Sequence, residues 1–278
     1  YRDLIKDAQT DKDGNLIYLY ATNKDEQYSY IETAKAKGYS VLLLDGQLDT
    51  AMVNMLEQKF EKCRFSRVDG DVIDRLIQKE DAPKDQLSQE DAASLNGVFT
   101  AELPTMDKAQ FHVETAPMGE TATPVIITQS EYMRRMKDAS RYQQGMSFYG
   151  EMPDMYNVVL NSDHRLVKEV LTDMKTQLAD KLQPIESELK GLHARHAALE
   201  QEQKDKKLED LTEAEKNDLK QCDEAITAQE QARKDVWAAY GKQNAVVAQL
   251  IDLALLQNGL LRGEALSKFV NRSVSLIK

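Results

Sequence analysis

The chain has 278 residues, of which 41% are hydrophobic and 30% are charged, so it is long enough for about two domains with their own cores. A formal net charge of −11 argues against nucleic acid as a main partner, because phosphate binding requires a basic face. No apolar run approaches the ~20 residues that cross a bilayer, and the two cysteines have neither metal nor disulfide spacing, so we expect a soluble protein of the reducing cytoplasm with no membrane partner.

Strand and helix patterns alternate in the first part of the chain. Three apolar runs are typical of short strands: 16–20, 41–44 and 63–68. A helical stretch is expected at about 25–37, and a second helix follows because Met52, Met55, Leu56 and Phe60 recur at three- and four-residue spacing. This alternation predicts a small three-layer α/β subdomain with a parallel sheet over residues 1–85.

A polar stretch at about 79–96 separates this subdomain from the rest. It is either a linker or an exposed helix, and we place the domain boundary near residue 85. Beyond it we expect three strands and one helix, at 111–113, 125–127, 156–160 and 130–141. The sequence therefore predicts an α+β domain over residues 86–278.

A helical hairpin is predicted inside this second domain, at about 172–240. From Leu171 to Leu199 apolar residues recur at three- and four-residue steps, as in a coiled coil, and Pro184 is expected to kink or break that helix. After a polar tip, Thr212 and Glu215 form a capping-box pattern that begins a second, weaker stripe. Two stripes joined by a capped tip predict an antiparallel coiled coil.

The end of the chain is its most apolar part. A run rich in Val, Leu and Ile between Val246 and Leu256 leads to Asn258-Gly259, a typical helix stop, and a last helix is expected after Gly263. These two helices carry more apolar surface than a chain end can bury within its own fold. The pattern therefore predicts a contact with a second copy of the chain.

No pattern typical of an active site is present. The sequence has no phosphate-binding glycine loop, nucleophile elbow or metalloprotease helix. Asp163-His164 has the residues of half a catalytic triad but lies at an expected helix start, where such residues cap. His193 and His196 are one turn apart, but His196 falls on the coiled-coil stripe. We predict no catalytic residue, cofactor or metal in this chain.

Methionines gather in one short stretch of the second domain. Five of the ten lie there, at positions 133, 136, 146, 152 and 155, close to several aromatic residues. Because methionine is flexible and polarizable, such a surface suits varied apolar partners. The alternative is that these side chains are buried in the core or at a hinge.

Five segments in order resemble the C-terminal half of the ninety-kilodalton heat-shock chaperones, in particular their bacterial group, high-temperature protein G. Residues 160–167, Leu-Asn-Ser-Asp-His-Arg-Leu-Val, are similar to the family signature Leu-Asn-Pro-Asp-His-x-Leu-Val, with Ser162 in place of proline. The other similar segments are 16–20, 38–49, 132–137 and 253–272. The resemblance leaves out the hairpin, where the family usually has a short connection.

The resemblance implies a non-catalytic part of an ATP-dependent chaperone of the heat-shock response, acting in protein folding. The chain starts at Tyr1 without an initiating Met, so we expect an excised piece whose ATP and magnesium site lies upstream. The expected partners are a second copy and unfolded client proteins. The expected client-binding residues are Tyr132, Met133, Met136, Tyr142, Met146 and Phe148. The expected dimerisation residues are Leu253, Leu256, Leu260, Phe269, Val270, Val274 and Ile277.

An alternative interpretation places dimerisation in the hairpin. In that case the chain is a structural coiled-coil assembly protein, joined through residues 171–240, and the α/β subdomain is only a scaffold. The two hypotheses differ in which helices a second copy covers.

Overall fold

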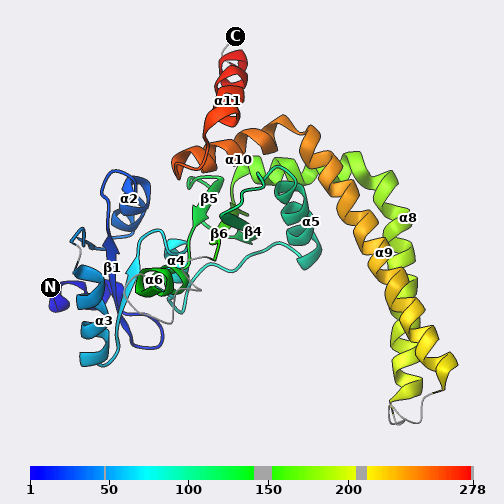
Figure 1. Cartoon of the computed structure of the whole chain (residues 1–278), viewed down its shortest axis with the longest axis horizontal. Coiled ribbons are helices and arrows are strands. Elements are labelled where there is room, and N and C mark those ends of the chain that lie inside the picture. The colour runs from blue at the N-terminus through cyan, green and yellow to red at the C-terminus, as the bar shows by residue number, and fades with distance from the viewer. Residues whose placement is uncertain (47, 141–151, 205–211, 277–278) are drawn as a thin grey trace.

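The computed structural model of the chain describes residues 1–46, 48–140, 152–204 and 212–276 (Figure 1). A small α/β unit comes first. Its elements are α1 (Arg2–Gln9), β1 (Leu16–Ala21), α2 (Tyr28–Ala36), β2 (Val41–Leu43), α3 (Asp49–Lys59), β3 (Cys63–Arg67) and α4 (Ile73–Leu76).

The sheet of this unit is parallel, with the strand order β2-β1-β3. Alternate residues of β1 serve opposite faces. Ile17 and Leu19 pack with residues of α2 and α4 on one face, while Tyr20 packs with Val53 of α3 on the other. Helices therefore cover both faces, which confirms the predicted small α/β unit with a parallel sheet.

The second part of the chain begins after a segment without helix or strand. Its elements are α5 (Gln89–Thr100), β4 (Ala109–Ala116), β5 (Val125–Thr128), α6 (Glu131–Ser140), β6 (Asp154–Asn161), α8 (Arg165–Gln203), α9 (Glu213–Gln243), α10 (Ala245–Gln257) and α11 (Gly263–Leu276).

Helix α5 corrects the interpretation of residues 79–96 as a linker or an exposed helix. Residues 79–88 are a connection without helix or strand between the two parts of the chain. The following helix, α5, is a core helix, in which Leu95, Val98 and Phe99 are fully buried. These three apolar residues lie at the end of a polar stretch, so the composition of the stretch did not indicate a buried helix. Ser88 caps the helix by accepting a hydrogen bond from the Asp91 amide, at 3.0 Å.

A second sheet has the order β4-β6-β5, with β4 parallel and β5 antiparallel to the central strand. Val158 and Leu160 of β6 are completely buried, in a core shared with α5, α8, α9 and α10. The mixed sheet and its helices confirm an α+β second part.

Helices α8 and α9 form the predicted antiparallel hairpin and run side by side away from the body (Figure 1). The predicted capping box is present, because Thr212 accepts a hydrogen bond from the Glu215 amide while the Glu215 carboxylate accepts one from the Thr212 amide. Pro184 lies inside α8, which does not break there but changes direction along its length (Figure 1). The proline removes one hydrogen-bond donor and is exposed, while Leu182 and Leu189 on either side of it are buried.

Helix α10 packs against β5 of the second sheet, and α11 leaves the body in a different direction from the hairpin (Figure 1). Helix α10 ends where the sequence predicted, at Asn258, and the next residue, Gly259, has a φ of +66°, which favours glycine. Helix α11 then begins at Gly263.

Candidate functional site

Helix α6 turns its charged residues inward, toward the first unit. Glu131 accepts hydrogen bonds from the Tyr20 hydroxyl at 2.6 Å and from Arg135 Nε at 2.7 Å. Arg135 also donates to Glu57 Oε2 of α3 at 2.6 Å and to the Phe65 carbonyl at 3.0 Å. Burial alone lowers the pKa of Arg135, but the hydrogen bonds to Glu57 and Glu131 outweigh it and raise that pKa.

Because this charged face is held inward, α6 presents apolar side chains outward. Tyr132 is 65% exposed, and Met133 and Met136 are half-buried. Three of the predicted client-binding residues therefore share one short helix at the surface. The other three, Tyr142, Met146 and Phe148, lie outside the described residues.

Helix α3 adds apolar residues beside α6. Met52 and Met55 are exposed, whereas Val53 is buried, the one such residue of α3 among those whose burial the structure describes. Phe60 and Tyr132 line one groove of about 650 Å³ together with Arg135, so the two helices border the same surface. We use the name α3–α6 surface for the exposed or half-buried apolar residues on and next to these two helices, which are Leu48, Met52, Met55, Phe60, Tyr132, Met133 and Met136.

The sequence did not predict the α3 part of this surface. Met52 and Met55 point outward because Asn54 and Glu57, on a neighbouring face of α3, hold Arg135. The partners Glu57 and Arg135 are 78 residues apart in sequence, so no local pattern records their contact.

The two terminal helices have a second exposed apolar surface. Leu253 and Leu256 of α10 are 45% and 41% exposed, and Val270 and Val274 of α11 are 47% and 53% exposed. Each pair lies on one helical face, because its members are three or four residues apart. We call Leu253, Leu256, Val270 and Val274 the terminal surface.

Three predicted dimerisation residues lie elsewhere. Phe269 is 8% exposed and packs into the core of its own chain. Leu260 is half-buried against that core, and Ile277 lies outside the described residues. Helix α11 contacts α10 through polar groups as well, since Arg272 donates to Asp252 Oδ2 at 2.7 Å.

The hairpin covers its own apolar residues. Leu178, Leu182 and Leu189 of α8 and Cys222 and Trp237 of α9 are all buried. Among the described residues of α8 and α9, no large apolar side chain is exposed. The outer faces of both helices are polar, so the apolar residues of the hairpin are buried within one chain.

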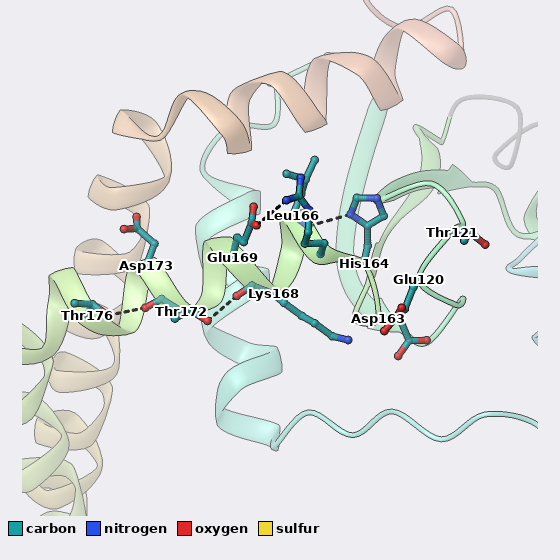
Figure 2. A pocket seen from close by; sticks show the side chains of 11 residues that line it. Glu120, Thr121, Asp163, His164, Leu166, Lys168, Glu169, Thr172, Asp173 and Thr176 are labelled. Atoms are coloured by element: carbon teal, nitrogen blue, oxygen red, sulfur yellow. Dashed lines mark hydrogen bonds and ion pairs between the residues drawn. The ribbon is translucent and has the colours of Figure 1, made fainter.

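The segment Asp163-His164 lies at the start of α8, beside an open groove of about 1000 Å³ (Figure 2). His164 Nδ1 accepts a hydrogen bond from the Leu166 amide at 3.1 Å, and Asp163 accepts one from the Gly119 amide at 2.9 Å. In the same groove, the Thr172 and Thr176 hydroxyls donate to backbone carbonyls one turn earlier (Figure 2). His164 is therefore the N-cap of α8, while Asp163 binds the backbone of the loop at Gly119.

The two histidines of the hairpin, His193 and His196, have different surroundings. His196 lies 2.9 Å from Asp223 of α9 and 3.5 Å from Glu200, whereas His193 is exposed. The part of the chain that the structure describes contains no group of three or more metal-ligating side chains. Nor does it contain a helix with the length and apolar character to span a membrane.

Comparison with known proteins identifies the family. No family model matches the chain. However, the chaperone proteins HtpG of Bacteroides fragilis and Bacteroides thetaiotaomicron are 57% and 56% identical to it over 277 residues. The chain belongs to the HtpG chaperone family. HtpG of Porphyromonas gingivalis is 45% identical over the same length.

The match covers all of this chain but 41% of the length of the two Bacteroides relatives, in their C-terminal part. It therefore runs through the hairpin. The expectation that the hairpin lies outside the resemblance is wrong for these HtpG relatives. Residues of α8 and α9 belong to the shared sequence.

Proposed function

We propose that this chain is the client-binding and dimerisation part of an ATP-dependent chaperone of the cytoplasm. In this proposal, residues 1–85 are the small subdomain of the middle domain, and residues 86–278 are the dimerisation domain. ATP and magnesium then bind to another part of the full-length protein, and this chain does not hydrolyse ATP.

The client-binding part rests on one observation, the exposed apolar side chains of the α3–α6 surface. Exposed apolar side chains that gather on neighbouring helices of a folded protein are common at interaction sites. Methionine side chains adapt to partners of different shape, which suits a protein that binds many unfolded sequences. The buried charges beneath α6 support this role, because they fix the helix while leaving its outer face uncovered.

The dimerisation part rests on the terminal surface. Two helices from each of two copies would form a four-helix bundle around a two-fold axis. Leu253, Leu256, Val270 and Val274 have the spacing that such a bundle requires. The alternative coiled-coil assembly has less support, because the described hairpin residues have no exposed large apolar side chain to offer a second copy.

The client-binding proposal is tested by the double variant Tyr132→Ser with Met55→Ser. Both side chains are more than half exposed, so the melting temperature should stay nearly unchanged. Affinity for an unfolded model protein, measured by fluorescence anisotropy, should fall about 10- to 100-fold, since interface residues of this type contribute about 1–3 kcal/mol. Tyr132 and Met55 are chosen because they are more exposed than the half-buried Met133 and Met136, whose substitution would also affect packing.

A matched control carries Tyr28→Ser with Leu43→Ser. These residues are similarly exposed but belong to α2 and β2. If both double variants weaken binding equally, clients recognise apolar residues anywhere on the chain, and the α3–α6 surface is not the client site.

A further inference from the structure

A polar cavity of about 370 Å³ lies where the two parts of the chain meet. The first unit contributes Arg67 from β3, and the second contributes Thr128 from β5 and Arg134 from α6. Arg262, in the connection between α10 and α11, completes the lining. Groups from three separate stretches of sequence therefore converge on one partly open cavity.

The lining of this cavity is rich in arginine. Arg67, Arg134 and Arg262 line it with two carboxylates, Glu26 and Asp69, and a third carboxylate, Glu131, lies 3.9 Å from Arg134. The whole chain carries −11. A concentration of arginines in an acidic protein favours a ligand of negative charge.

The carboxylate of Asp69, which lines the cavity, is already paired with arginine side chains. Arg67 binds Asp69 through two hydrogen bonds of 2.6 Å, and Arg134 lies 3.5 Å from it. Although burial raises the pKa of Asp69, these two arginines outweigh it and hold the pKa below its usual value. Arg262 is exposed, donates from Nε to the Gly259 carbonyl at 2.8 Å, and has no ion pair within the described residues.

The unused hydrogen-bonding groups of the cavity are mostly donors. The Thr128 hydroxyl is fully buried without a partner in the described part of the chain, and the Tyr156 hydroxyl also lacks one there. The amide nitrogen of Gln27 is turned toward Asp69 but does not reach hydrogen-bond geometry. Because burying an unpaired donor costs about 1–3 kcal/mol, such a lining favours an acceptor-rich ligand.

The buried arginine supports the same conclusion. Burial lowers the pKa of Arg134, and the neighbouring Arg67 lowers it further, against the opposite effects of Asp69 and Glu131. The net direction is downward, although Arg134 also donates three hydrogen bonds to Gln129. A nearby anion would raise this pKa.

We infer that this cavity binds a small oxyanion with at least two negative charges, of the class of inorganic phosphate, pyrophosphate or a small polycarboxylate. Arg262 and the Tyr156 and Thr128 hydroxyls would donate to its oxygens, while Arg67 and Arg134 supply the surrounding positive charge. A bound anion would join the first unit, the second sheet and the connection that leads to α11. This inference is independent of client binding.

The test is isothermal titration calorimetry of the chain with phosphate, pyrophosphate and citrate, in separate runs. Sodium chloride keeps the ionic strength constant and shows whether chloride competes. We expect saturable binding of one anion per chain for at least one of the three, and the preferred anion distinguishes a phosphate site from a carboxylate site. Arg262→Gln should weaken this binding about 10- to 100-fold, because it removes a charged hydrogen bond.

Two further variants complete the experiment. Arg195→Gln removes an exposed arginine from the hairpin and should leave binding unchanged. Tyr156→Phe keeps the ring and removes only the hydroxyl, so affinity should fall about three- to tenfold. The inference is overturned if no anion binds saturably, or if Arg195→Gln and Arg262→Gln weaken binding equally, which indicates nonspecific attraction of anions.

Discussion

The hairpin and the terminal helix pair both carry apolar stripes, but only the hairpin buries its stripe. Leu182 and Leu189 of α8 are covered by the chain itself, whereas Leu256 and Val270 remain exposed. Periodicity in the sequence identifies which face of a helix is apolar. It does not identify which molecule covers that face.

The difference follows from how each pair is connected. Helices α8 and α9 are long, antiparallel and packed along one another, so each buried position on one helix has a partner on the other. Helix α11 instead leaves the body, and Phe269 is its one buried residue among those described. The remaining apolar face of α11 needs a partner from outside the chain.

The largest effect is expected from charging the terminal surface. In a two-fold dimer, Leu256→Asp with Val270→Asp places four charges in the interface, and each costs more than the apolar contact it replaces. We expect at least about 1000-fold weaker dimerisation, with folded monomers in sedimentation at micromolar concentration. Phe269 is left intact, since a charge there would disrupt the core of its own chain.

The matched control charges Tyr28 and Leu43, which are equally exposed but lie in the first unit. It should remain dimeric. A terminal-surface variant that also sediments as a dimer would contradict the bundle.

The hairpin should respond in the opposite way to a charge. Leu189→Asp buries a carboxylate at a position that is 4% exposed, at a cost of about 3 kcal/mol or more to the hairpin. Hydrogen exchange should accelerate in α8 and α9, while sedimentation still shows a dimer. Loss of the dimer would instead support the coiled-coil assembly hypothesis.

Local patterns were sufficient for most of the fold. The six strands lie where apolar runs predicted them, and the capping box at Thr212 and the stop at Gly259 are specified by residues within a few positions of one another. Helix α5 was misread because its apolar residues are few and its N-terminal half is polar. At Pro184 the sequence predicted a kink or a break without deciding between them, and α8 continues through it.

The candidate sites depended on contacts that no local pattern contains. Arg134 and Arg135 have the appearance of solvent-exposed charges, yet both are largely buried, with carboxylate partners more than 60 residues away. These contacts orient α6 so that Tyr132 lies on its exposed face. The same long-range pairing builds the polar cavity, which the sequence did not suggest.

A smaller effect is expected at the base of the hairpin. A methyl group added at Gly241 would lie 2.2 Å from the Val98 carbonyl oxygen, so α9 and α5 could not approach as closely. Gly241→Ala should lower the free energy of unfolding by about 2–3 kcal/mol in urea titration. In contrast, Gly191 in α8 faces open space, and Gly191→Ala should stabilise the hairpin by up to about 1 kcal/mol. Equal effects from the two substitutions would show that the hairpin is not locked at its base.

The smallest effect is expected near the tip of the hairpin, where α9 begins. Thr212→Ala removes the hydroxyl that accepts from the Glu215 amide, and the loss of such a cap costs about 1 kcal/mol. Only the first turn of α9 depends on it, so hydrogen exchange should accelerate for amides 213–216 and remain unchanged in α10 and α11.

Thr212→Ser keeps the hydroxyl and should behave like the unchanged chain. Neither substitution should alter the dimer, because the terminal helices are a separate apolar surface. If Thr212→Ala weakens dimerisation while Thr212→Ser does not, the start of α9 contributes to the contact between copies. The hairpin would then be part of the assembly, as the terminal surface is proposed to be.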